Sequence, residues 1–330
     1  MRVLVTGGAG YVGSHAARLL ARHGHDVWVY DNLSQGHRGA APVDRLIVGH
    51  LSDRERLEAA LSTNAIDAVM HFAAFTLVGE SVTDPAKYYQ NNVFGSFSLI
   101  ESMRAVGVKR IVFSSTAAVY GQPESSPINE QAVLAPVNPY GFTKLSIEQL
   151  LLDYAAAYGF GFAALRYFNA AGAAPEGDLG EDHHPESHLI PLVLQVALGQ
   201  RPHITVFGND YATPDGTCIR DYIHVDDLAA AHIKALELLQ PGVALRMNLG
   251  TGRGHSVQEV IEACRSVTGH PIPAVMGERR AGDPAELVAD SRLAQATLGW
   301  TPQHTDLREI VASAWRWHSK HPQGYGDRHR

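Results

Sequence analysis

An apolar segment at the start of the chain runs directly into three evenly spaced glycines. Residues 2–6 read Arg-Val-Leu-Val-Thr, and Gly7, Gly10 and Gly13 lead into an amphipathic stretch at 11–23. Glycine permits a tight turn and a close backbone approach to a pyrophosphate, and the following helix N-terminus supplies free N–H groups. This order of strand, glycine turn and helix predicts the first unit of an α/β dinucleotide-binding fold.

An acid at the end of the second apolar segment refines this prediction. Asp31 stands 18 residues after Gly13, close to the spacing at which a carboxylate reaches the adenosine ribose hydroxyls. A carboxylate there repels a 2′-phosphate, so we expect NAD rather than NADP. Arg38 follows in a polar loop, where an arginine is more often solvated than bound to a phosphate.

Short β-branched runs alternate with longer amphipathic stretches through the first half of the chain. We expect helices near 11–23, 53–63, 84–106 and 140–158, and strands at 2–6, 26–30, 46–48, 68–72, 110–114 and 161–167. This alternation predicts a Rossmann-type, doubly wound parallel sheet with helices on both faces.

The rhythm changes after Asn169, where a segment rich in Gly, Pro, acids and histidines begins. We therefore expect a cofactor domain at 1–170 and a smaller mixed α/β substrate domain at 171–330, with segments around 205–240 returning to the first domain. In the second half we expect strands at 204–207 and 245–249, and helices near 189–199, 226–239, 256–268, 290–298 and 305–318.

Charge and cysteine content exclude several classes of function. The net charge of −7 and the lack of a like-charge block argue against a nucleic-acid partner. No apolar run of 18 residues and no signal-like leader is visible, so we expect no membrane association. The two cysteines, Cys218 and Cys264, form neither a disulfide framework nor a thiolate metal motif. A cytoplasmic location is therefore expected.

The most informative chemistry lies in Tyr140-Gly-Phe-Thr-Lys144, which opens a predicted helix. Residues four apart share one helical face, so the ammonium of Lys144 can lie beside the phenol of Tyr140. A tyrosine with its ordinary pKa of ~10 is a poor base at neutral pH. A neighbouring lysine and an oxidised nicotinamide favour the phenolate, which can then remove an alcohol proton as a hydride leaves. The chain holds five lysines in 330 residues, so a chance pair is a poor explanation.

The predicted strand at 110–114 delivers hydroxyl groups to the carboxyl edge of the sheet, where ligands of open α/β sheets bind. Ser114, Ser115 and Thr116 follow one another there. Thr116 is placed to hydrogen-bond a reacting alcohol oxygen, although serine and threonine also begin many ordinary loops.

At this point the chain resembles the extended short-chain dehydrogenase/reductase family, and within it the 4-epimerases of UDP-galactose and UDP-glucose. The resemblance runs from Met1 to about Tyr325. The motifs that carry it include VTGGAGYVGSH at 5–15, HFAAFTLVGES at 71–81, FSSTAAVYG at 113–121, NPYGFTK at 138–144, LRYFNAAGA at 165–173 and VFGNDYATPDGTCIRDYIHVDDLA at 206–229.

The resemblance implies an isomerase with tightly bound NAD and a set of site residues. Tyr140, Lys144 and Thr116 would be catalytic. Implied cofactor contacts are Gly7, Gly10, Tyr11, Val12, Gly13, Asp31, Asn32, Leu51, Phe72, Ala73, Ala74, Asn91, Ser114, Tyr140, Lys144 and Tyr167. Implied substrate contacts are Thr116, Tyr140, Asn169, His188, Leu189, Thr205, Phe207, Arg220, Tyr222, Arg280, Asp283 and Leu287. Arg220 and Arg280 suit a diphosphate because a guanidinium offers a fork of donors.

The reaction implied by the resemblance inverts C4 of a UDP-hexose through a transient 4-keto sugar. Tyr140, its pKa lowered by Lys144 and NAD⁺, would take the 4-OH proton as C4 hydride passes to the nicotinamide. The 4-keto sugar would then turn over and take the hydride back on its opposite face. A homodimer through the helices at 84–106 and 140–158 is implied in the same way.

Several alternatives stay open. Dehydratase and decarboxylase relatives need an acid after Thr116, where this chain has Ala117-Ala118. The sequence does not exclude a 4-epimerase of UDP-uronic acids or UDP-pentoses. A non-catalytic NAD-binding regulator is a further class, disfavoured by the intact Tyr140 and Lys144.

Four features depart from the family pattern or stay unassigned. His50 stands where an acid often reaches the adenine amino group, and Thr76 where some members have a lysine. Leu287 is intermediate in size at a position that gates sugar size, so use of N-acetylhexosamines stays open. The run Asp182-His-His-Pro-Glu-Ser-His188 invites a metal, but we expect no metal and a substrate loop instead.

Overall fold

A computed structural model describes residues 1–41, 44–280 and 283–327. Its largest element is a sheet of seven parallel strands in the order β10-β6-β5-β4-β1-β2-β3. The bounds are β1 Arg2–Thr6, β2 Asp26–Asp31, β3 Leu46–Val48, β4 Ala68–His71, β5 Arg110–Thr116, β6 Gly161–Tyr167 and β10 Ala244–Leu249. The strand order reverses between β1 and β4, which opens a ligand crevice at their carboxyl ends. The predicted doubly wound sheet is therefore confirmed.

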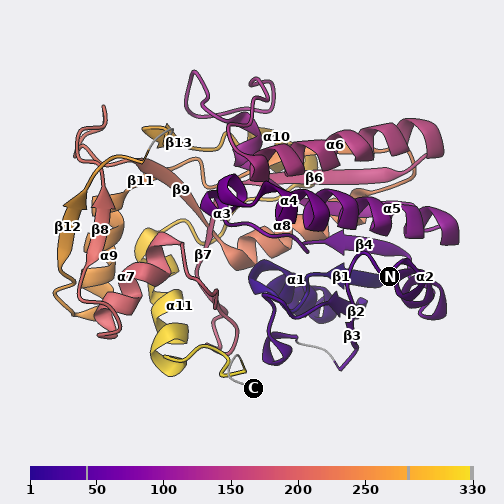
Figure 1. Cartoon of the computed structure of the whole chain (residues 1–330), viewed down its shortest axis with the longest axis horizontal. Helices are drawn as coiled ribbons and strands as arrows, with labels where there is room; N and C mark the ends of the chain where they lie inside the picture. Colours follow the sequence, from indigo (N-terminus) through magenta and orange to yellow (C-terminus); the bar gives the residue numbers. More distant parts are fainter. Residues whose placement is uncertain (42–43, 281–282, 328–330) are drawn as a thin grey trace.

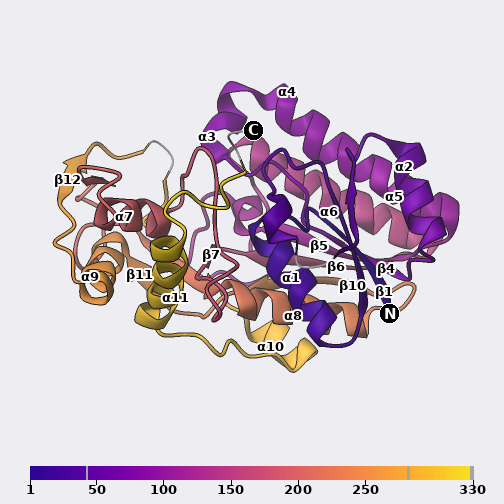
Figure 2. The same cartoon turned by 90° about the horizontal axis from the view of Figure 1, so that it is seen from below.

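Helices cover both faces of this sheet (Figure 2). On one face lie α1 Tyr11–Arg22, α8 Val225–Leu238 and α10 Arg292–Leu298, and on the other lie α2 Arg54–Thr63, α5 Gly95–Val106 and α6 Pro139–Tyr158. Each face has its own apolar core, one including Val3, Leu228 and Leu298 and the other including Leu57, Ile100 and Leu151. Short 3₁₀ turns lie at Arg38–Ala40 and Ala117–Tyr120.

Two late segments of the chain complete the large sheet layer. Strand β10 pairs with β6, with Leu249 opposite Tyr167, and α8 packs beside α1. The chain thus leaves the sheet after Tyr167 and later returns to it, so the two halves are joined by several crossings (Figure 1).

The helix expected at 84–106 differs from a regular α-helix. It follows α3 Val78–Thr83 and consists of α4 Pro85–Tyr88, a π-helical turn at Tyr89–Phe94, and α5. The wider turn aims Asn92 inward, where its Oδ1 accepts a hydrogen bond from Phe75 N at 2.9 Å and its Nδ2 donates to Phe75 O and Thr143 Oγ1. An inserted residue of this kind often marks a functional region.

A second lobe is built from β7 Asn169–Ala171, α7 Leu189–Ala197, β8 Ile204–Phe207, β9 Ile219–His224, β11 Gly254–Ser256, α9 Val257–Thr268, β12 Ala274–Gly277, β13 Glu286–Leu287 and α11 Leu307–Lys320. Strand β9 pairs with β7, β11 and β13, while β8 pairs with β12. A third apolar core, including Val193, Val260 and Ile310, holds the helices together. Within the described residues, no helix is both long and apolar enough to cross a bilayer.

Candidate active site

The glycine turn after β1 leaves no room for side chains at Gly7 and Gly13. A Cβ on Gly13 would lie 2.1 Å from Gly7 O, and a Cβ on Gly7, whose φ is +72°, would lie 2.5 Å from Ala73 N. Helix α1 then begins at Tyr11 with Gly10 in the N-cap position, no side-chain cap and no acid in its first turn. The turn therefore offers free N–H groups and a positive dipole end to an anion, which fits a dinucleotide pyrophosphate.

Asp31 is held beside this turn at the end of β2. Its Oδ2 accepts a hydrogen bond from Ala9 N at 3.0 Å and its Oδ1 accepts one from Leu33 N at 2.8 Å. Burial raises the pKa of Asp31, and these two backbone hydrogen bonds oppose the rise. The carboxylate is thus fixed at the sheet edge where the sequence predicts a ribose. Asn32 instead closes a local turn by accepting Ser34 N.

The remaining cofactor candidates lie at the carboxyl ends of neighbouring strands. Phe72 N donates to Thr6 O at 2.9 Å, which places residues 72–74 against the glycine turn. The hydroxyls of Ser114 and Tyr167 lie 2.7 Å apart at the ends of β5 and β6. Leu51 packs under Gly95, and Asn91 lies in the π-helical turn. The predicted cofactor residues therefore line one edge of the sheet.

Tyr11 has a partner that the sequence did not indicate. Its hydroxyl donates to Gly172 O at 2.7 Å, and its ring meets the imidazole of His183 edge-on at 6.2 Å. Tyr11 thus bridges the glycine turn and the segment that leads into the second lobe. His50, the departure from the family pattern, forms a local contact with Ser52 Oγ at 2.8 Å.

Tyr140 and Lys144 project from the first turns of α6. Asn138 Oδ1 accepts Gly141 N at 2.9 Å and so caps the helix, while Tyr140 N donates to Ser81 Oγ at 3.2 Å. The buried ammonium of Lys144 donates to Ser114 O at 2.7 Å and lies 5.9 Å from the centre of the Tyr140 ring. The structure thus brings the predicted pair together over the end of β5.

The electrostatics of the pair differ from the expectation drawn from sequence. Burial raises the pKa of Tyr140, Tyr167 raises it further, and a hydrogen bond with Thr116 lowers it. Burial lowers the pKa of Lys144 to about 7, against the opposing effect of the Glu148 carboxylate. In the protein without cofactor, loss of hydration therefore outweighs the hydrogen bond with Thr116. The lowered pKa of Tyr140 that the family resemblance implies includes the charge of NAD⁺ and stays a prediction for the complex.

Sequence reasoning did not find the network that supports Lys144. Glu148 Oε1 accepts a hydrogen bond from Ser115 Oγ at 2.5 Å and another from Arg166 Nε at 2.9 Å. Arg166 also donates to Tyr120 OH at 2.9 Å, and its side chain is only 1% exposed. The available signal was the spacing of four residues between Lys144 and Glu148, which puts both on one helical face.

Most predicted substrate residues gather around β9. Asn169 of β7 lies opposite Tyr222, and Leu287 of β13 lies opposite Arg220. Leu287 also packs against the apolar cluster of Ala117, Val119, Tyr120 and Ile128, which includes the segment that follows Thr116. Strand pairing and packing thus connect the second lobe to the catalytic candidates.

The two arginines expected to grip a diphosphate already have partners. Arg220 forms an ion pair with Asp283, and Asp283 N donates to Arg280 O at 3.3 Å. The guanidinium of Arg280 stacks 4.1 Å above the half-exposed ring of Phe207 on β8. Thr205 lies two residues earlier on the same strand.

The last two substrate candidates lie at the entrance to α7. Leu189 is the first residue of α7 and packs against the core that includes Ile204 and Tyr222. His188 is the N-cap residue of α7, and its Nδ1 lies 2.6 Å from Glu181 Oε1. No contact ties His188 to Arg220 or Asp283 within the part of the chain that the structure describes.

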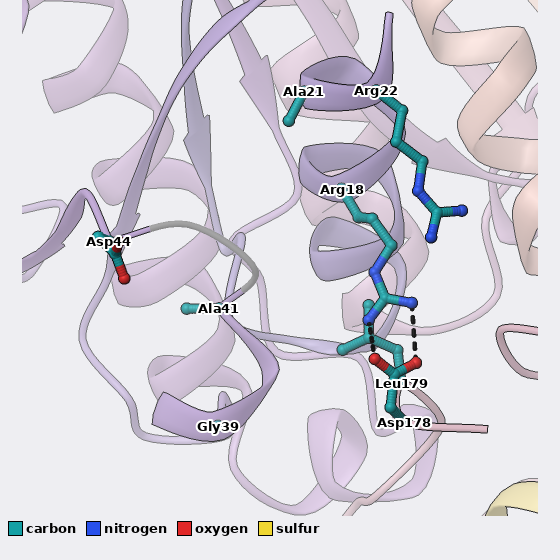
Figure 3. A pocket seen from close by; sticks show the side chains of 8 residues that line it. All are labelled: Arg18, Ala21, Arg22, Gly39, Ala41, Asp44, Asp178 and Leu179. Atoms are coloured by element: carbon teal, nitrogen blue, oxygen red, sulfur yellow. Dashed lines mark hydrogen bonds and ion pairs between the residues drawn. The ribbon is translucent and has the colours of Figure 1, made fainter. Parts of the chain in front are cut away.

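A cavity of about 720 Å³ lies elsewhere, beside α1 (Figure 3). Arg18 lines it but forks onto Asp178, with nitrogen-to-oxygen distances of 2.9 and 2.8 Å. The cavity includes neither Tyr140 nor Lys144, so we do not assign the site to it.

Comparison with known proteins shows which family this chain resembles. The model of the NAD dependent epimerase/dehydratase family matches residues 3–250. The chain is 55% identical over 326 residues to the UDP-glucose 4-epimerase of Halalkalibacterium halodurans, covering 98% of each chain.

Two solved structures are also similar. A UDP-glucose 4-epimerase from Brucella ovis in complex with NAD is 49% identical, with a TM-score of 0.93 and coverage of 96% of this chain and 98% of that one. A UDP-glucose 4-epimerase from Bifidobacterium longum in complex with NAD⁺ and UDP is 40% identical, with a TM-score of 0.93 and coverage of 98% and 100%. The glycine turn, the Tyr140–Lys144 pair and these similarities agree: the chain belongs to the NAD dependent epimerase/dehydratase family.

Proposed function

We propose that the protein is an NAD-dependent isomerase that interconverts UDP-galactose and UDP-glucose by inverting C4 of the sugar. The observation that carries the proposal is the placement of Tyr140, Lys144 and Thr116 at the sheet edge onto which the glycine turn opens. Relatives similar over nearly the whole chain are UDP-glucose 4-epimerases, which supports the same substrate.

In the proposed reaction, Tyr140, Thr116 and Lys144 each have a separate role. Bound NAD supplies a hydride acceptor that returns the hydride within the same turnover. Tyr140 takes the proton of the sugar 4-OH as the C4–H bond breaks, and Thr116 orients the same oxygen. Lys144, anchored on Ser114 O, places a positive charge beside the ring and favours the phenolate. After the 4-keto sugar turns over, Tyr140 returns the proton to its oxygen.

The second lobe supplies the nucleotide side of the site in this proposal. Asn169, Tyr222 and Leu189 contact the uridine side, together with Thr205 and the Phe207 ring. Arg220 and Arg280 turn toward the diphosphate, which competes with Asp283 for Arg220. We assign His188 to the rim of this site, as the family resemblance implies.

The decisive experiment is conversion of UDP-galactose to UDP-glucose by purified protein without added reductant. We expect turnover without net NADH formation, and a loss of about 10²–10⁴-fold in kcat for Tyr140→Phe with NAD still bound. Phe142→Tyr on the exposed side of the same helix turn is the matched control. Accumulation of NADH alone, or full activity of Tyr140→Phe, would contradict the proposal.

Leu287 is proposed to limit the size of the sugar that the site accepts. It packs against the apolar cluster of Ala117, Val119, Tyr120 and Ile128, which includes the segment that follows Thr116. Leu287→Ala should raise kcat/KM for UDP-N-acetylgalactosamine relative to UDP-galactose by roughly 10-fold, because removing methylenes opens the pocket. A competition assay with both sugars measures the ratio, with the exposed Leu293→Ala as control. UDP-uronic acids and UDP-pentoses in the same assay test the alternative substrates.

We further propose a homodimer and a cytoplasmic setting. The helices α5 and α6 and the π-helical turn expose Tyr89, Phe94, Phe97 and Phe142, with 39–59% of each residue accessible. Both cysteines are buried free thiols, which suits a reducing compartment.

We also propose how the two domains share the ligands. Residues 1–170, together with α8 and β10, bind the cofactor, and the second lobe binds the UDP-sugar.

A further inference from the structure

Four side chains of the loop before α7 converge on one point. Glu181, His183, Glu186 and His188 each contribute one potential ligand atom, and all four atoms lie within 4.8 Å of one another. The side chains of Glu181 and Glu186 are each 4% exposed, whereas that of His188 is 45% exposed. The cluster is thus an acidic, imidazole-lined pocket with one open side.

The distances between these atoms bracket those around a tetrahedral ion. Zinc bonds of about 2.0–2.2 Å to nitrogen and oxygen place tetrahedral ligand atoms roughly 3.3–3.6 Å apart. The Nδ1 atoms of His188 and His183 lie 2.6 and 3.1 Å from Glu181 Oε1. The same atoms lie 3.4 and 3.9 Å from the carboxylate oxygens of Glu186. Coordination would require the Nδ1 of His188 and the Oε1 of Glu181 to separate by about 0.7 Å, and the other distances to change by at most about 0.3 Å.

Charge favours one ion over two protonated imidazoles. Two nearly buried carboxylates need compensating positive charge. Protonating both histidines would put two cations side by side, because their ring centres are 5.3 Å apart. One divalent ion neutralises both carboxylates while the imidazoles stay neutral ligands.

The backbone also fixes the ligands in place. Ser187 N and His188 N donate to Glu186 Oε1 at 2.7 and 2.8 Å, and Trp317 Nε1 donates to the backbone oxygen of Glu181 at 3.2 Å. Hydrogen bonds of this kind orient metal ligands and reduce the reorganisation needed on binding.

We propose that Glu181, His183, Glu186 and His188 bind one divalent transition-metal ion of the zinc class. This departs from the sequence expectation, which placed no metal in the loop. Four protein ligands leave no open position, so the ion is structural rather than catalytic. It would pin the N-cap residue of α7, and it would hold His183 against Tyr11 at the start of α1. The proposal does not depend on the reaction assigned above.

The test begins with full-length protein purified without a metal-affinity tag. Elemental analysis for Mn, Fe, Co, Ni, Cu and Zn should give about one transition-metal ion per chain after dialysis against zinc-containing buffer. Cobalt(II) titrated into chelator-treated protein should produce the visible absorption of a tetrahedral site, and zinc should abolish it. This titration needs no variant. Absence of bound metal together with absence of the cobalt spectrum would overturn the proposal.

Variants then locate the ion. Glu186→Gln and His183→Gln should each lower retained metal at least tenfold and remove the rise in melting temperature that zinc gives the parent protein. His203→Gln, on an exposed loop, is the control for surface binding and should retain the metal. Equal metal retention by all three variants would place the ion elsewhere and contradict this assignment.

Discussion

Lys144 titrates near neutral pH because burial opposes its charge while the Glu148 carboxylate supports it. The ammonium cannot leave this position, since it is anchored on Ser114 O at 2.7 Å. Burial of the side chain that we propose to activate Tyr140 therefore also carries a cost to folding. Retaining a buried amine makes physical sense at a catalytic position, where a shifted pKa serves the reaction.

This cost predicts a pH-dependent stability. The pKa of Lys144 falls from its ordinary 10.5 to about 7 on folding. Between these values the unfolded chain holds a proton that the folded chain lacks, so stability from this group rises with pH. Lys144→Met should raise the free energy of unfolding by ~3 kcal/mol at pH 7, at about 1.4 kcal/mol per pKa unit less the lost hydrogen bond.

The measurement is urea unfolding of both proteins, without added nucleotide, at pH 7, 8.5 and 10. The gain should fall by about 1.4 kcal/mol per pH unit and reach zero between about pH 9 and 10, where the lost hydrogen bond offsets the remaining charge effect. Lys109→Met, at an exposed position just before β5, provides the control. A gain that does not change with pH would show that packing, rather than charge, is responsible.

At the same scale, the sequence predicts Tyr140 and Lys144 as the reacting pair, whereas their protonation depends on the fold. The spacing of Tyr140 and Lys144 follows from helical geometry, which sequence alone provides. The raised pKa of Tyr140 arises from burial and from Tyr167, which folding brings in from another strand. The partners of Arg220 and Arg280 are likewise supplied by chain folding, and no local pattern indicates them.

Among the elements, the π-helical turn at Tyr89–Phe94 does the most to shape the site. It turns Asn92 inward, where the side chain bonds both polar groups of the Phe75 peptide and Thr143 Oγ1. Thr143 is the neighbour of Lys144, so this turn ties the loop after β4 to the catalytic helix.

Asn92→Ala should therefore destabilise the protein by about 1–3 kcal/mol, because it leaves buried polar groups without partners. Urea unfolding measures the change, and Gln90→Ala, an exposed position in the same turn, should stay within about 0.5 kcal/mol of the parent. Equal effects of the two substitutions would remove the special role of Asn92.

Long periodic elements were predictable, whereas short ones were not. The first six strands of the large sheet and β10 follow from apolar runs. Strands β7, β9, β11, β12 and β13 were missed because their pairing is tertiary. In β9, the buried Asp221 accepts hydrogen bonds from Thr251 N, Gly252 N and Ala289 N. A strand with a buried acid does not show the apolar pattern on which prediction depends.

For the whole molecule, the exposed aromatic residues on α5 and α6 predict self-association. Phe97→Glu should convert a dimer to a monomer, because a charge placed in an apolar interface loses its hydration without a partner. Light scattering coupled to size exclusion measures the mass, and Val133→Glu, in the loop before α6 and 77% exposed, should leave it unchanged. A monomeric parent protein would remove the basis for this prediction.

The return of β10 to the large sheet affects how the protein is made. Strand β6 ends at Tyr167, but the strand that covers its edge begins only at Ala244. At synthesis rates of about 5–20 residues per second, the ribosome leaves this edge unpaired for several seconds. An open edge recruits other chains. The edge of β6 in the nascent protein is therefore open to mispairing until the second lobe has emerged.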